Sequence, residues 1–97
     1  MTAQAQAMLK TVAQELYLSQ EELLRRGMRS LLEHQLREVK AEIFEIHGRY
    51  DISSVEEMEA RYRDSTLEEA ESWRDLQRLD HLEYKRDRLL RLLEAMS

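Results

Sequence analysis

Between residues 32 and 50, apolar residues recur at alternating spacings of four and three, the pattern of a long amphipathic helix with one apolar stripe. Such a stripe is typical of a coiled-coil seam and has to pack against another helix. We therefore expect a long helix that folds back on a second long helix and dimerises along this stripe. The stripe consists of Leu32, Leu36, Val39, Ile43, Ile46 and Tyr50.

The amino-acid composition also favours a fold made of long helices. The 97 residues include no proline and two glycines, with 42% apolar and 36% charged residues, which predicts one nearly all-α domain, residues 1–97. A chain of this size buries only about 60 to 65% of its unfolded surface, so a second copy would add useful burial. Cysteine is absent, and no apolar run approaches the roughly 18 residues of a membrane span. We expect a cytoplasmic protein without disulfides or membrane contact.

Local signals predict where the long helix begins and ends. Ser19 can cap it and Glu22, three residues later, can complete a capping box, so the helix should begin near Gln20. Gly48 follows His47 where a C-terminal cap is expected, because glycine enters the left-handed conformation without steric cost. The helix should therefore end at Gly48.

Two further helix starts follow. Ser53 with Glu56, or Ser54 with Glu57, predicts a helix of about two turns, and a second serine or threonine box predicts a last helix running to the C-terminus. The short helix should present Val55, Met58 and Tyr62 on one face. The second box is Ser65 with Glu68 or Thr66 with Glu69, and the apolar stripe of the last helix is Leu79, Leu82, Arg86, Leu89, Leu93 and Met96, with Trp73, Leu76 and Leu90 beside it.

The N-terminal part is less uniform. Leu9, Val12 and Leu16 predict a helix from about residue 8, whereas residues 2–7 alternate small polar residues with alanine and leave a short strand open as an alternative. Gly27 lies inside a helical pattern, where it costs about 1 kcal/mol relative to alanine. The simplest reason for it is close approach of another helix, as at a dimer crossing.

No catalytic or metal-binding motif stands out. None of the three histidines has a glutamate three residues before it, and HExxH and glycine-rich phosphate loops are absent. The twenty acidic residues offer no distinguishable catalytic pair. We expect no enzyme activity, no cofactor and no metal.

Charge is concentrated in one segment. Residues 51–75 carry nine acidic side chains against three arginines, a net charge of −6, whereas the remaining residues sum to +1. Trp73, the only tryptophan, lies within this segment. It is interpreted as a core anchor of the last helix, with an interface anchor as the alternative. In the second case Tyr62, Trp73 and Leu76 would contact a partner.

The run MLKTVAQELYLSQEELLRRGMRSLLEHQL resembles the paired helices of ribbon-helix-helix regulators and antitoxins, through its leucine spacing and its turn before Ser-x-x-Glu-Leu. The matching residues are Ala13, Leu16, Leu18, Ser19, Leu23, Leu24 and Leu31, and Gly27 stands where that family has a small residue. The resemblance implies a strand before these helices, whose alternate residues enter the DNA major groove. The implied DNA-binding residues are Thr2, Gln4 and Gln6, followed by Lys10.

Residues 36–89 also look like the C-terminal half of small helical antitoxin-like proteins, in which a long helix, a glycine turn, a short helix and a tryptophan-centred segment follow one another. Together the resemblances imply a non-catalytic antitoxin-like homodimer that neutralises a toxin. Residues 1–47 would serve dimerisation and DNA binding, and residues 48–97 would bind the partner. The alternatives are a structural dimeric adaptor and a ribbon-helix-helix-type transcriptional regulator.

Overall fold

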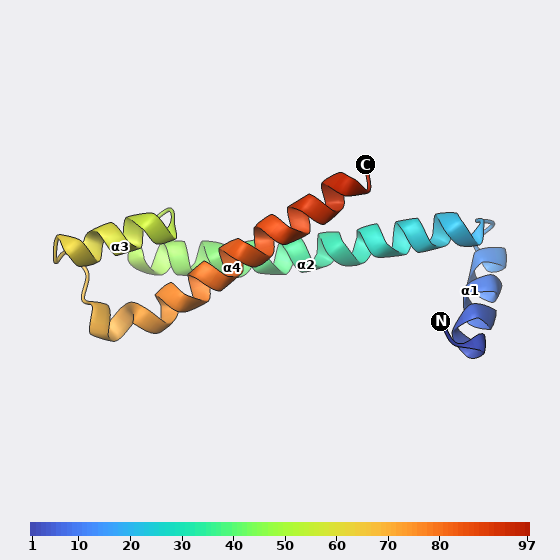
Figure 1. The fold of residues 1–97 in the computed structure, drawn as a ribbon, viewed down its shortest axis with the longest axis horizontal. Helices are drawn as coiled ribbons and strands as arrows, with labels where there is room; N and C mark the ends of the chain where they lie inside the picture. The colour runs from blue at the N-terminus through green and yellow to red at the C-terminus, as the bar shows by residue number, and fades with distance from the viewer.

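The structure, a computed structural model, describes residues 1–97 as four helices and contains no strand. Helix α1 spans Ala3–Glu15, α2 spans Gln20–Tyr50, α3 spans Val55–Arg63 and α4 spans Glu69–Ala95. Helices α2 and α4 cross along the middle of the molecule, α3 lies beside the end of α2, and α1 leaves the start of α2 at a steep angle (Figure 1). The molecule measures 60 × 25 × 18 Å. The predicted all-α class is confirmed.

Helix α4 runs antiparallel to α2. Three polar contacts establish this direction, because residue numbers rise along α2 while those of the partners fall along α4. One of these contacts joins residue 29 of α2 to residue 96, at the end of α4. Helix α4 therefore ends opposite residue 29 and does not reach the first turns of α2. The contacts are Arg29 Nη2 to the Met96 carbonyl oxygen (3.2 Å), Arg78 Nη2 to Glu42 Oε2 (2.7 Å) and Arg49 Nη1 to Asp75 Oδ2 (2.7 Å).

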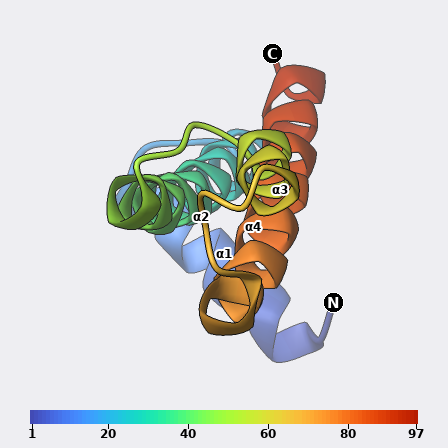
Figure 2. The same cartoon turned by 90° about the vertical axis from the view of Figure 1, so that its left-hand side faces the viewer.

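The core lies where α2, α3 and α4 meet, and it buries most of the predicted stripe of α2. Ten buried residues form it, and the end-on view shows α2 on one side and α3 with α4 on the other (Figure 2). The stripe is therefore covered by α4 of the same chain, and the expectation that it is the dimer seam is wrong. The ten residues are Leu36, Val39, Ile43, Ile46, Ile52, Val55, Met58, Leu79, Leu82 and Leu89.

The start of α2 is confirmed, but its predicted end is wrong. Ser19 Oγ accepts the backbone N–H of Glu22 at 3.0 Å, as a helix cap does. At the other end, Gly48 has helical conformation and α2 continues to Tyr50. Asp51 takes the left-handed conformation instead, with φ of 53°, and short polar residues of this kind tolerate it. This later end brings Ile52 into the core.

Replacing Gly48 by alanine is expected to stabilise the protein by about 0.5 to 1 kcal/mol. The backbone at Gly48 is already helical, and no atom lies within 4 Å of the position an added Cβ would take. Urea denaturation followed by circular dichroism measures the change. A glycine needed at a left-handed cap would give the opposite sign, so destabilisation would contradict this end of α2.

The predicted short helix forms, whereas the predicted cap of the last helix does not. Ser54 Oγ accepts the Glu57 N–H at 3.0 Å, and the Glu57 carboxylate accepts the Ser53 N–H at 2.8 Å. The hydrogen bonds from the Ser53 hydroxyl and N–H lower the pKa of Glu57. By contrast, the N-cap position of α4 is Glu68, which makes no side-chain cap, and the Thr66 hydroxyl donates to Asp64 Oδ1 at 2.6 Å instead. Both predicted boxes for α4 are therefore wrong.

Gly27 faces open space. No atom lies within 4 Å of the position that its Cβ would take, so no helix of this chain approaches it. The predicted close approach is therefore absent within one chain. Gly27 lies in the first turns of α2, the part that α4 does not cover.

Candidate functional site

The acidic residues gather at one end of the elongated molecule. Residues 51–75, which we call the acidic end, comprise the connection after α2, all of α3, the next connection and the first two turns of α4. This end faces the viewer in Figure 2. Seven of its nine acidic side chains are exposed. The charge segregation seen in the sequence is thus also a segregation in space.

Trp73 lies on the surface of the acidic end. Its side chain is 41% exposed, and it lines a shallow hollow on α4 together with Glu69, Ala70, Leu76 and Gln77. The interpretation of Trp73 as a core anchor is therefore wrong. The preceding residue, Ser72, takes the buried position, because neighbouring helix residues point about 100° apart.

The other two predicted partner-binding residues are less exposed. Leu76 packs partly against the core while lining the hollow beside Trp73. Tyr62 is also partly buried, and its hydroxyl lies 2.7 Å from Ser72 Oγ. Since Ser72 Oγ donates to the Glu68 carbonyl oxygen at 2.8 Å, the Tyr62 hydroxyl is the donor to Ser72. Tyr62 lines an adjoining hollow, so the three residues lie at one end of the molecule, and Trp73 is the most exposed of them.

Sequence reasoning missed a polar cluster at the edge of the acidic end. The Asp75 carboxylate accepts hydrogen bonds from the hydroxyl of Tyr50 and from Arg49. The Tyr50 bond is the main cause that lowers the pKa of Asp75, while burial raises the pKa of Tyr50 and the nearby carboxylate adds to that rise. Tyr50 and Arg49 precede Asp75 by 25 and 26 positions in the sequence, so no short-range spacing predicts the cluster.

The predicted DNA-binding residues lie on or before a helix, and the alternative strand over residues 2–7 is not formed. Thr2 caps α1 and its hydroxyl accepts the Ala5 N–H at 3.0 Å. Gln4 and Gln6 are two helical positions apart, about 200° around the axis, and so point in nearly opposite directions. Lys10 follows Gln6 by one turn and shares a shallow hollow with it. The common face that a strand would give these residues is therefore lost.

The comparisons with known proteins decide the family. The family model described as the Uncharacterized protein MJ0235 family matches residues 1–97. The chain belongs to this family. No curated protein and no solved structure matches the chain.

No group of three or more histidine, cysteine, aspartate or glutamate side chains comes together in a way that could hold a metal ion. None of the four helices combines the length and apolar character needed to cross a membrane.

Replacing Tyr50 by phenylalanine is expected to lower the free energy of unfolding by about 1 kcal/mol at pH 7. The lost hydroxyl holds the pKa of Asp75 below its ordinary value near 3.9. A carboxyl whose pKa is lowered by folding contributes stability above its unfolded pKa, and this contribution is lost as pH falls through the folded pKa. The difference between the variants should therefore shrink from pH 7 to pH 3 in urea titrations.

Tyr84→Phe is the matched control. The Tyr84 hydroxyl is exposed and accepts only a 3.4 Å hydrogen bond from Arg88, so its removal should change stability little at either pH. An equal loss for Tyr50→Phe at pH 7 and pH 3 would show that its hydroxyl does not act through the Asp75 carboxylate.

Proposed function

We propose that the protein is a non-catalytic, antitoxin-like homodimer that binds and neutralises a partner toxin through its acidic end. One observation carries the proposal: Trp73 is held on the surface of a segment with net charge −6, outside the core. Tryptophan is enriched among the residues that dominate binding energy at protein interfaces. The adjoining Leu76 adds apolar area to the same hollow.

The charge at this end defines the partner. A surface of exposed carboxylates around one aromatic ring complements a basic surface, and such complementarity raises association rates and excludes acidic partners. A ribonuclease is the toxin class that fits best, because its RNA-binding cleft has to be basic to contact phosphates. Carboxylates of the acidic end would then occupy the place of the RNA backbone.

A structural dimeric adaptor is the second candidate, since the elongated antiparallel pair of α2 and α4 would also suit a spacer between two partners. The adaptor differs from the antitoxin in having no toxin to neutralise. A regulator that binds DNA through a ribbon is not part of the proposal, because Thr2, Gln4 and Gln6 lie at the start of a helix.

Co-production with the protein encoded by the neighbouring gene tests the proposal. We expect the two proteins to co-purify at low salt and the growth defect caused by the neighbour alone to be relieved. Because the attraction is electrostatic, association should slow as salt rises. If the chain neither binds its neighbour nor relieves toxicity, the antitoxin proposal fails and the adaptor remains.

A further inference from the structure

The end of the molecule opposite the acidic end exposes an apolar groove between α2 and α4. Its lining is entirely apolar, and three of its side chains are largely exposed: Met28 at 53%, Leu31 at 60% and Leu92 at 48%. A contiguous exposed apolar surface of this kind marks interaction sites in soluble proteins. We call it the open-end groove, lined by Met28, Leu31, Leu32, Leu92, Ala95 and Met96.

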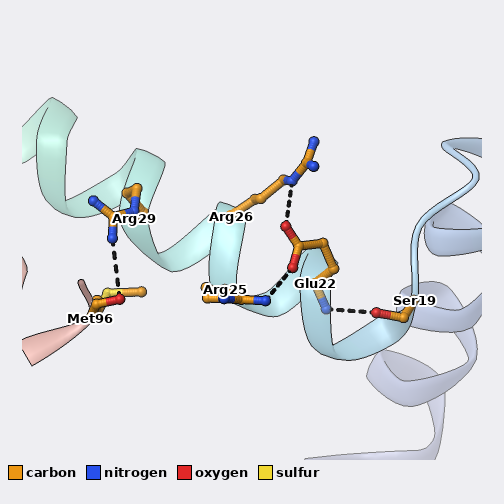
Figure 3. Close-up of polar contacts among 6 residues, drawn as sticks. All are labelled: Ser19, Glu22, Arg25, Arg26, Arg29 and Met96. Carbon is orange, nitrogen blue, oxygen red and sulfur yellow. Dashed lines mark hydrogen bonds and ion pairs between the residues drawn. The ribbon is translucent and has the colours of Figure 1, made fainter.

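On the α2 side of the groove, the neighbouring charged side chains already have polar partners. The Glu22 carboxylate binds Arg25 and Arg26, which lie along α2 before the groove, and Arg29 donates to the carbonyl oxygen of Met96 at 3.2 Å (Figure 3). The hydrogen bond from Arg26 is the main cause that lowers the pKa of Glu22. Covering the α2 side of the groove would therefore not require one of these side chains to be buried without a polar partner, which would be costly.

The chain exposes more surface than a compact monomer of its mass. Its accessible surface is 7363 Å², whereas a folded monomer of 11.7 kDa exposes about 5,900 Å². Its radius of gyration is 19.6 Å, against about 12 to 13 Å for a compact domain of this length. A stable protein interface removes about 800 Å² from each partner. The excess surface is therefore large enough for such an interface.

We propose that a second copy of this chain covers the open-end groove, in a two-fold symmetric contact made by Met28 and Leu31 of α2 together with the end of α4. This location deepens the proposed homodimer and does not depend on toxin binding. In a symmetric contact each copy presents the same patch, so Met28 and Leu31 of one copy lie against the same region of the other. The free space over Gly27 lets the two α2 backbones approach closely.

The charge distribution selects a second copy as the occupant. Outside the acidic end, residues 1–50 and 76–97 together contain twelve basic and eleven acidic residues, so this part of the chain carries little net charge with which to attract a charged macromolecule. Two copies that meet there also keep their acidic ends, each with net charge −6, at opposite extremes of the dimer. Contact between the acidic ends would bring like charges together, which opposes association. The position of the groove and the distribution of charge therefore both favour a dimer that forms at the open end and keeps the two acidic ends apart.

Light scattering coupled to size-exclusion chromatography tests the interface with the full chain. The wild type should have twice the 11.7 kDa mass of one chain, whereas Leu31→Glu and Leu92→Glu should weaken the dimer on the order of 100-fold and elute as monomers. Both positions are exposed in one chain, so circular dichroism should show unchanged helicity. Phe44→Glu is the matched control, because Phe44 is 79% exposed on α2 but lies outside the groove, and it should remain a dimer.

The possible outcomes separate the groove from the other proposals. A monomeric wild type would overturn both this interface and the homodimer. A dimer that survives both glutamate substitutions would overturn the groove as its location and leave dimerisation through another face. Neither outcome changes toxin binding at the acidic end, because that binding is measured independently by co-purification with the neighbouring protein.

Discussion

Replacing Leu79 by alanine is expected to lower the free energy of unfolding by about 3 kcal/mol. Leu79 is fully buried in the core formed by α2, α3 and α4, so the substitution removes apolar contacts and leaves a cavity. A chain of this length has a total stability of roughly 5 to 15 kcal/mol, and a core of ten buried residues favours the lower end. The loss should lower Tm by about 12 °C or more.

Leu90→Ala is the control for this prediction. Leu90 lies on the same helix and is partly exposed outside the core, so its truncation should change stability by less than about 1 kcal/mol. Thermal and urea unfolding followed at the helical circular dichroism signal measure both variants. Equal losses at the two positions would contradict the packing of α4 against α2 through Leu79.

Replacing Trp73 by alanine is expected to weaken binding of the proposed partner toxin about 30-fold, which corresponds to about 2 kcal/mol. The tryptophan ring is the largest apolar group exposed at the acidic end, and the Arg74 guanidinium lies 5.5 Å from its centre. Since the ring is outside the core, stability should change by less than about 1 kcal/mol. Isothermal titration of each variant with the purified partner measures the change in affinity.

Tyr84→Ala provides a closely matched comparison for Trp73→Ala. Tyr84 is 58% exposed on the same helix, and the Arg88 guanidinium lies 5.9 Å from its ring centre, but it is outside the acidic end. Its removal should leave partner affinity nearly unchanged. If Tyr84→Ala weakened binding as much as Trp73→Ala, the partner would contact another face of α4.

Features determined by neighbouring residues were predictable from the sequence. Ser19 and Ser54 each cap the helix that follows, and the period of the stripe from Leu32 to Tyr50 correctly marked the buried face of α2. In these cases the interaction spans at most four residues, so spacing alone contains the information.

Features determined by packing were not predictable. The stripe of α2 required a helical neighbour, but its period does not specify whether α4 or a second chain supplies it. Likewise, Trp73 is exposed although the preceding residue, Ser72, is buried. A rotation of the helix by one residue position would decide which of the two side chains faces the core. The extension of α2 past Gly48 also depends on the tertiary fold, because it places Ile52 in the core.

The N-terminal residues show a further limit of pattern reasoning. Alternation of alanine and glutamine over residues 3–7 is compatible with a strand, but both residues also have good helix propensity. The Thr2 cap and the absence of a pairing strand leave the helix as the state that satisfies the backbone hydrogen bonds. The strand that the resemblance implied for residues 2–7 is absent for this reason, so Thr2, Gln4 and Gln6 do not share one face of a strand.

Amide hydrogen exchange of the wild-type protein, with and without the proposed partner toxin, most directly tests the claim that the acidic end binds a partner. Binding through the acidic end predicts slower exchange in residues 62–77, the segment that includes Tyr62 and Trp73, and little change in the first turns of α2. Protection confined to α1 and the start of α2, or no protection anywhere, would contradict a partner-binding role for the acidic end.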